Sequence, residues 1–316
     1  MIEFLHILGG LLGSAMLAGG VLVIAGVGET FAQKAGVYNL GLEGLISLGA
    51  VTAVATVAAT ESLTVACLAA AAVGIVTGIM FAGVTVVMKA NQVISGLALS
   101  FLGVGLAAWL GDNYAGQRSA VIFEKVPIPF LSGIDTIGPA FFNHPIPVYL
   151  AFFLLPPLAH YVMFYTRLGL SIRAVGENPA AADATGVGVT LIRSGAVVFS
   201  CAMAALAGAY LTLVFVPSWS ETVVGGRGWI AIALVIFAGF RPLMVGVGAF
   251  LFGLVTAFGF LAQARGMDIP PTLLSSLPYL LTVGFMMLPL ITSRRGRRNL
   301  ADPPAALGAP YYRDER

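Results

Sequence analysis

Long apolar runs separated by short polar stretches make up most of this chain. Lipid offers no hydrogen-bond partner to the backbone, so a run that enters a membrane must form a helix or a strand of a closed barrel. None of the runs alternates between polar and apolar residues as a barrel strand does. The pattern therefore predicts about nine transmembrane helical segments, over residues 4–27, 42–60, 63–88, 93–111, 146–165, 192–216, 229–240, 243–262 and 273–292.

One of these segments is short or broken. Residues 229–262 are apolar except where Arg241 and Pro242 interrupt them, which divides the stretch into a short helix over 229–240 and a full span. A helix of that length measures only ~18 Å, whereas the hydrocarbon core is ~30 Å thick. We expect the short helix to pack inside protein, and whether it crosses the membrane or re-enters it is open at this point.

The composition supports an all-α polytopic membrane protein. Of 316 residues, 59% are hydrophobic and 9% are charged, against about 25% charged residues in soluble domains. So few charges cannot cover a soluble globule, and the high apolar content excludes disorder. We expect a transmembrane domain over 1–293 and a cytoplasmic, mostly disordered tail over 294–316, which is rich in arginine and proline.

The residue types that bind metals or form disulfides carry no pattern here. Cys67 and Cys201 both fall inside apolar runs, and the three histidines are far apart. We therefore expect neither a disulfide framework nor a metal site.

The placement of Lys and Arg predicts the orientation, because cytoplasmic loops carry an excess of them. Counting nine segments back from the arginine-rich tail puts twelve of the 16 basic residues in the cytoplasm and four outside. The amino terminus is then outside, together with the long loop over 112–145.

The loop over 167–191 contains the signals of a two-turn helix. Asn178 is a good N-cap, since its side-chain oxygen can accept a first-turn N–H. Pro179 suits the first helical position, and Gly186 can adopt the left-handed conformation that ends a helix. A helix of two turns is not stable alone, and another part of the protein or a partner must therefore pack on it. The alternative is an ordinary loop.

Three sequence blocks stand in an order and spacing that is specific to one transporter family. They read LGLSIRAVGENPAAADATGVGV at 168–189, AGVYNLGLEGLISLGA at 35–50 and GGRGWIAIALVIFAGFRP at 225–242. The first resembles the cytoplasmic coupling loop of ABC importer permeases of the branched-chain amino acid and simple-sugar class. The other two are similar to signatures of the nucleoside and simple-sugar subset of that class.

The resemblance implies a permease subunit of a bacterial cytoplasmic membrane that pairs with a second permease subunit, a paralogue or a second copy. It also implies cytoplasmic ATPase subunits and an extracytoplasmic substrate-binding protein, for which the loop over 112–145 is the expected docking site. The chain has no phosphate-binding loop motif, so we expect ATP and Mg²⁺ to bind to the ATPase and no cofactor or nucleic acid to bind here. The residues expected to couple to the ATPase are Gly176, Glu177, Asn178, Pro179, Ala180, Ala181, Asp183 and Gly186.

Polar residues near the apolar runs are candidates for the substrate path, because such groups at membrane depth are costly and usually face protein or water. Each has a structural alternative: Asn39 and Glu43 could cap the helix that begins near Leu42, Asn91 and Gln92 could simply end a loop, and the tryptophan could anchor at the membrane interface. The candidates are Asn39, Glu43, Asn91, Gln92 and Trp229.

The leading hypothesis is an ABC importer permease for nucleosides, purine nucleosides above all, or related simple sugars. The alternative is a secondary transporter or channel for a small polar solute. Proton-coupled carriers usually keep acid or histidine residues within their spans, and no acid pairs are evident in these. No catalytic constellation is visible, so we do not expect an enzyme.

Overall fold

A helix occupies each of the nine predicted ranges. The computed structural model describes residues 2–292, apart from 120, 136 and 268, and residues 303–313. The arginines at 294, 295, 297, 298 and 316, on which the predicted orientation partly rests, lie outside the described residues. The helices in these ranges are α1 (Ile2–Lys34), α2 (Leu42–Thr60), α3 (Leu63–Ala82), α4 (Gln92–Gly111), α7 (Leu155–Tyr165), α10 (Val189–Tyr210), α11 (Arg227–Phe237), α12 (Pro242–Ala264) and α13 (Pro271–Thr292).

Shorter elements extend or connect these helices. The π-helical turns η1 (Gly83–Val87) and η4 (Leu211–Phe215) extend α3 and α10, and η3 (Leu150–Leu154) joins α6 (Ile146–Tyr149) to α7. The remaining elements are η2 (Asp112–Tyr114), α5 (Ile137–Phe141), α8 (Arg167–Glu177), α9 (Pro179–Ala184) and an antiparallel pair of strands, β1 (Lys125–Pro127) and β2 (Asn143–Pro145).

The protein is an all-α polytopic membrane protein, as the apolar pattern predicts. Seven helical stretches among the described residues are long and apolar enough to span a bilayer, and α11 is a shorter apolar helix of 11 residues. The boundaries of α2 coincide with the predicted range, whereas α1 continues past its predicted end to Lys34. Hydropathy misses this last part because it contains the polar residues Glu29 and Gln33, which are buried in protein.

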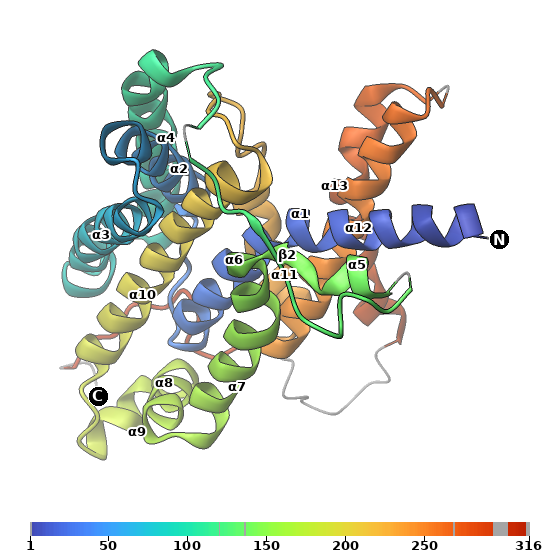
Figure 1. Cartoon of the computed structure of the whole chain (residues 1–316). Coiled ribbons are helices and arrows are strands. Elements are labelled where there is room, and N and C mark those ends of the chain that lie inside the picture. Colours follow the sequence, from blue (N-terminus) through green and yellow to red (C-terminus); the bar gives the residue numbers. More distant parts are fainter. Residues whose placement is uncertain (1, 120, 136, 268, 293–302, 314–316) are drawn as a thin grey trace.

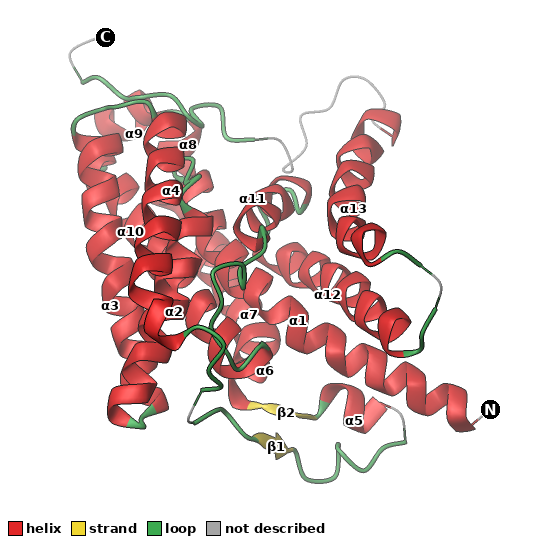
Figure 2. Ribbon diagram, turned by 90° about the horizontal axis from the view of Figure 1, so that it is seen from above, coloured by secondary structure: helices red, strands yellow, loops and turns green. Residues whose placement is uncertain are grey.

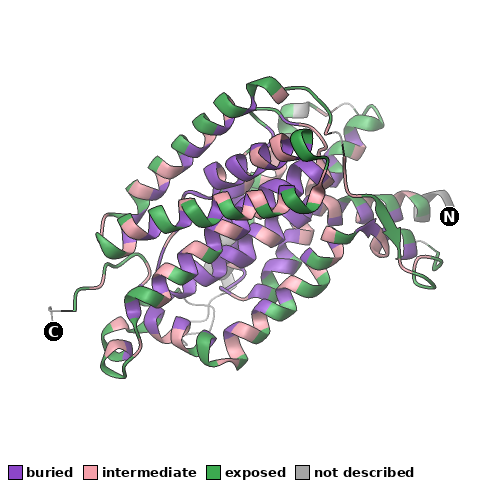
Figure 3. Ribbon diagram, turned by 60° about the vertical axis from the view of Figure 1, so that its left-hand side comes forward, coloured by how far each residue is buried: buried purple, intermediate pink, exposed green. Residues whose placement is uncertain are grey.

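Helices α1 and α10 form the centre of the molecule (Figure 1). Helix α1 packs against α10, α11 and α12, and α10 packs against α2 and α3. Buried positions gather on these central helices, while the outer helices expose apolar side chains (Figure 3). Glycines permit close crossings: a Cβ at Gly49 of α2 would collide with the backbone of Ala205, and one at Gly208 of α10 with that of Ile46.

The loops and short elements gather at two opposite ends of the helix bundle (Figure 2). One end carries α8, α9 and residues 303–313, and the other carries β1, β2 and α5. At the α8–α9 end, the Lys34 ammonium lies 5.1 Å from the centre of the Phe240 ring, and the Lys89 ammonium lies 4.1 Å from that of Tyr312. The clustering of basic residues at this end predicts that it faces the cytoplasm.

Helix α11 crosses the bundle together with the irregular segment that precedes it. This segment begins at the β1–β2 end, where Trp219 forms a β-bridge with Ala115. It then passes inward until the Gly226 N–H meets the Glu43 carboxylate of α2. From there α11 continues toward the α8–α9 end, which the chain reaches at Phe240. The short helix therefore does not return to the end from which it came.

The carboxyl-terminal tail differs from the prediction of a mostly disordered end. Residues 303–313 lie against the α8–α9 end, where the Ala306 N–H donates to the Gly176 carbonyl and the Gly308 N–H donates to the Gly36 carbonyl. Pro304 and Ala306 are buried. The composition of the tail could not reveal these contacts, because their partners lie more than a hundred residues earlier in the chain.

Candidate functional site

Residues 168–189, which resemble the coupling loop of ABC importer permeases and are called the coupling segment below, fold as their local signals predict. Asn178 Oδ1 accepts a hydrogen bond from the Ala181 N–H at 3.0 Å, and Pro179 is the first residue of α9. At the other end, the Val187 N–H donates to the Ala182 carbonyl while Gly186 has a φ of +87°. This is a Schellman ending, which needs a left-handed residue at the position of the glycine. The predicted two-turn helix is confirmed.

The preceding helix α8 was missed by the sequence analysis. Its signal was present: the Thr166 hydroxyl accepts from the Gly169 N–H at 3.2 Å, and Ile172 and Val175 form a buried face. Gly176, near its end, is so close to the Lys34 carbonyl of α1 that a Cβ would collide with it. The coupling segment is therefore two helices fixed to the end of α1.

One face of α9 is buried and the other is exposed. Ala182 packs with Val175 and Val189 in a small apolar cluster, whereas Ala180, Ala181 and Ala184 are exposed. The exposed alanines give α9 a slim outer surface.

The two acidic side chains of the coupling segment already have partners within this chain. Asp183 accepts hydrogen bonds from Tyr311 and Arg313, and Glu177 accepts one from the Ala305 N–H at 3.4 Å. Asp183, one of the residues expected to couple to the ATPase, is therefore paired within this chain.

The candidate Asn39 belongs to a buried network of hydrogen bonds. Its side-chain amide donates to Ser200 Oγ at 3.2 Å, and its own N–H donates to Glu29 Oε1. Glu29 Oε2 accepts from Ser200 Oγ at 2.8 Å, and Gln33 completes the group. The network joins α1, the loop after it and α10, and Asn39 has no exposed surface. Its observed contacts are structural.

The candidate Glu43 binds the beginning of α11. Its two carboxylate oxygens accept the backbone N–H groups of Gly226 and Gly228, each at 2.7 Å. Unpaired N–H groups and the positive end of the helix dipole meet at a helix N-terminus, so a carboxylate there is favourable. Glu43 thus caps α11 from the neighbouring α2.

Of the other three candidates, Asn91 and Gln92 are neighbours at the start of α4, and Trp229 lies on a different helix. Asn91 caps α4 by accepting from the N–H groups of Val93 and Ile94, and Gln92 Oε1 accepts from the Tyr38 N–H at 2.9 Å. Both are at the α8–α9 end. Trp229 is on α11 and is 36% exposed.

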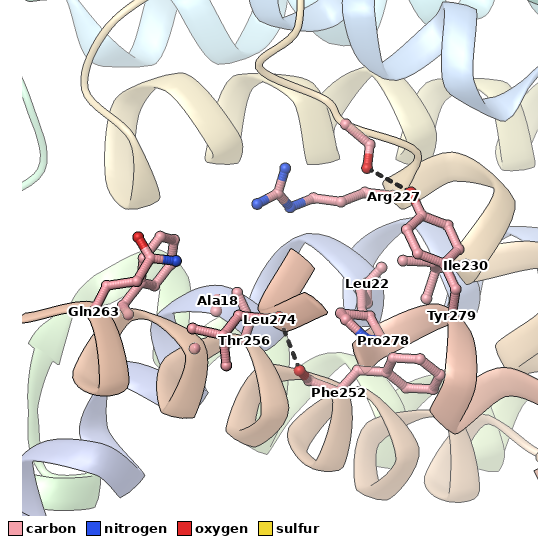
Figure 4. Close-up of a pocket in the computed structure, with 13 residues that line it drawn as sticks. Ala18, Leu22, Arg227, Ile230, Phe252, Thr256, Gln263, Leu274, Pro278 and Tyr279 are labelled. Carbon is pink, nitrogen blue, oxygen red and sulfur yellow. Dashed lines mark hydrogen bonds between the residues drawn. The ribbon is translucent and has the colours of Figure 1, made fainter. Parts of the chain in front are cut away.

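A cavity of about 270 Å³ lies between α1, α11, α12 and α13. Its walls are largely apolar, with Leu22, Phe252 and Phe260 among them, and Figure 4 shows the Arg227 guanidinium extending into the space. Thr256, Gln263 and Tyr279 add polar groups. We call this space the Arg227 cavity.

The Arg227 side chain is positioned from the segment before α11. Its Nη1 donates to the carbonyls of Val223 and Val224, both at 2.8 Å, and the guanidinium lies 5.5 Å from the centre of the Phe215 ring. Among the described residues, Nε and Nη2 have no hydrogen-bond partner. The Tyr279 hydroxyl donates to the Gly225 carbonyl at 3.0 Å and holds α13 to the same turn. The donors that remain on Arg227 in the described part of the chain are therefore on Nε and Nη2, and they lie beside the Phe215 ring.

The polar residues of this cavity are not among the candidates that the sequence pattern indicates. A signal existed in α12, where Thr256 and Gln263 are seven residues apart in an apolar helix and so share a face. Nothing local connected that face to Arg227, which comes from another helix. Among the described residues, no three His, Cys, Asp or Glu side chains come together as a metal site would require.

Comparison with known proteins finds relatives among the permease subunits of ABC transporters. Residues 11–289 match the family described as the permease component of the branched-chain amino acid transport system. The chain is 35% identical to a putative glucose ABC transporter permease protein of Haloferax volcanii, over 96% of this chain and 98% of that protein. It is 32% identical to a nucleoside ABC transporter permease protein of Lactococcus lactis, over 83% and 86%. It is 29% identical to a guanosine ABC transporter permease protein of Bacillus subtilis, over 93% and 94%.

Proposed function

Since this chain belongs to the permease components of the branched-chain amino acid transport systems, we propose that the importer it forms carries purine nucleosides. It is a multi-pass protein of the cytoplasmic membrane, and a transport subunit rather than an enzyme. Permeases of ABC transporters work with an ATPase and a substrate-binding protein. ATP and Mg²⁺ then bind to the ATPase, and a second permease subunit, a paralogue or a second copy, completes the transport path.

The exposed surface of α9 is the proposed ATPase contact. Its start and end are fixed by Asn178 and Gly186, and its outer side carries only alanine methyl groups. A rigid helix of this kind can enter a groove and pass on a movement. Because α8 touches the end of α1 at Gly176, a displacement of α9 has a direct route to the central helices.

The Arg227 cavity is the observation that carries the proposed substrate. Nε and Nη2 of the guanidinium, which have no hydrogen-bond partner in the described part of the chain, are two neighbouring donors that match the two acceptors, O6 and N7, on one edge of guanine. Phe215 and Phe260 offer aromatic surface near the same group, and Thr256 and Gln263 can bind sugar hydroxyls. A volume of about 270 Å³ suits a small ligand.

A simple sugar is the second candidate. The relative from Haloferax volcanii supports it, because that protein is named as a putative glucose permease and covers nearly the whole chain. The two candidates differ in one respect that can be measured. Recognition through O6 and N7 favours guanosine over adenosine and gives no advantage to a free sugar.

The test is uptake of labelled guanosine, adenosine, glucose and ribose by the assembled transporter, with ligand binding to the cognate binding protein measured in parallel. We expect guanosine uptake that unlabelled glucose and ribose do not compete. Arg227→Gln should lower guanosine uptake about five-fold or more, since one bidentate contact discriminates by ~1–3 kcal/mol. Arg265→Gln, an exposed arginine at the end of α12, is the matched control. Glucose or ribose uptake that guanosine does not compete would refute the nucleoside assignment.

A further inference from the structure

Residues 303–313 cross the α8–α9 end of the molecule as one ordered segment, which we call the tail strap. Its backbone is fixed by hydrogen bonds from Ala306 to Gly176 and from Gly308 to Gly36, at 2.9 and 3.1 Å. The buried Arg193 of α10 links the segment to the loop after α1, because its Nε donates to the Ala35 carbonyl and its Nη1 donates to the Ala309 carbonyl. The strap is therefore held by three separate parts of the fold.

The end of the tail strap contacts α9 itself. The Tyr311 hydroxyl donates to Asp183 Oδ2 at 3.1 Å, and its ring packs against the cluster of Val175, Ala182 and Val189. Arg313 Nε contacts the same carboxylate oxygen at 3.1 Å. With 75% of its side chain exposed, the Arg313 ion pair adds little to stability. The apolar contact of Tyr311 does more to hold the strap beside α9.

The outer side of the tail strap is rich in residues that dominate protein interfaces. Pro310 is exposed, Tyr312 is 42% exposed with its ring beside the Lys89 ammonium, and Arg313 is 75% exposed. Tyrosine and arginine are the residue types most often found at energetic centres of interfaces. Because backbone hydrogen bonds already hold the segment, a partner would not have to order it.

We propose that the tail strap and α9 together form one composite surface that docks the ATPase subunit. This inference rests on the proposed role of α9. Arg313 contacts Asp183, which belongs to the same short helix as Ala181, and Tyr312 directly precedes Arg313 in sequence. A partner that docks on α9 therefore approaches the end of the tail strap as well. The partner that fits presents an apolar pocket to Tyr312 and a carboxylate to Arg313. The Lys89 ammonium beside the Tyr312 ring and the exposed guanidinium of Arg313 contribute positive charge to that part of the surface.

The proposal is tested with the full chain in nanodiscs and its purified ATPase subunit. Tyr312→Ala combined with Arg313→Ala should weaken ATPase association about ten-fold or more and lower substrate-stimulated ATP hydrolysis in parallel. Tyr161→Ala, which removes a tyrosine of α7 that is 59% exposed, is the control and should leave both unchanged. The two substituted side chains are exposed, so the tail strap should remain in place.

Accessibility gives a second measurement. A cysteine replacing Pro310 should react with a maleimide in the free permease and be protected at least several-fold when the ATPase subunit is bound. A cysteine at Glu61, the exposed residue that ends α2, should react equally in the free permease and in the permease with the ATPase subunit bound. Unchanged labelling at 310, association reduced less than two-fold, or raised ATP hydrolysis in the double variant would each overturn the proposal.

The failure of the tail strap proposal can be told from failure of the coupling role of α9. If Ala181→Trp abolishes substrate-stimulated hydrolysis while the strap variants have no effect, α9 docks alone and the composite surface is wrong. If Ala181→Trp also has no effect, the coupling assignment itself is wrong.

Discussion

Replacing Glu43 should damage the protein through α11, whose N-terminus lies 183 residues further along the chain but is in direct contact with Glu43 in space. The carboxylate accepts the N–H groups of Gly226 and Gly228, each at 2.7 Å. In Glu43→Ala both N–H groups lose their partner, at a cost of ~1–3 kcal/mol each. Loss of the favourable interaction with the helix dipole adds ~0.3–1 kcal/mol. Because Glu43 is only partly buried, we expect a total of about 2–4 kcal/mol.

Glu43→Gln removes the negative charge but keeps a side-chain oxygen, and it therefore distinguishes the effect of the charge from that of the hydrogen bond. The amide oxygen can still accept one N–H, so we expect a smaller loss of about 1–2 kcal/mol. For a chain of this size, thermal unfolding temperatures should fall by about 2 °C for each kcal/mol. Substrate uptake should fall in the same order, alanine below glutamine, because α11 carries Arg227 into the cavity. Thermal unfolding in detergent and uptake in proteoliposomes measure the two effects.

Glu61→Gln at the exposed end of the same helix is the control and should change neither quantity. The reasoning would be refuted if Glu43→Ala unfolded at the wild-type temperature and transported normally. It would be incomplete if glutamine were as harmful as alanine, since the charge alone would then account for the effect.

Three further predictions follow from other parts of the molecule. Asn178→Ala should destabilise α9 by ~1 kcal/mol and weaken coupling, while Asn178→Ser should retain the cap; substrate-stimulated ATP hydrolysis measures both. Burial of His144 lowers its pKa below the usual 6.5, and the hydrogen bond to the Ala140 carbonyl opposes this shift. As the pH falls through 6.5, the unfolded chain therefore binds a proton at this histidine more readily than the folded protein does. The free energy of unfolding should be highest above this pH and decline below it. The decline should be smaller in His144→Gln, as thermal unfolding at pH 8 and pH 5.5 would show. A cysteine at Asn113 should react with an impermeant maleimide from outside intact cells and one at Lys89 should not; the reverse pattern would invert the topology.

Local patterns were enough to predict the helices and the coupling segment. Lipid requires helical backbone, so apolar length alone located α2, and Asn178, Pro179 and Gly186 act on residues within one or two turns of themselves. The roles of Asn39 and Glu43 could not be read in this way. Their partners are 161 and 183 residues away, and only the folded bundle brings them together.

The same limit applies to the cavity and to the tail strap. Arg227 and Gln263 come from different helices, and no periodicity in either helix indicates the other. The tail was predicted to be solvated because its composition is that of a disordered segment. Its order depends on Tyr311 reaching the apolar cluster near α9 and on Arg193 reaching the Ala309 carbonyl.

The network around Glu29 also has a consequence for biosynthesis. Glu29 accepts a hydrogen bond from the Ser200 hydroxyl, which lies 171 residues further along the chain. At a synthesis rate of ~5–20 residues per second, Ser200 is made on the order of ten to thirty seconds after Glu29. During that interval α1 holds an acidic group that lipid alone would reject. The nascent α1 must therefore remain beside the insertion machinery, or another polar surface, until α10 arrives. Ser200→Ala should then lengthen the time for which the newly made chain can be crosslinked to that machinery.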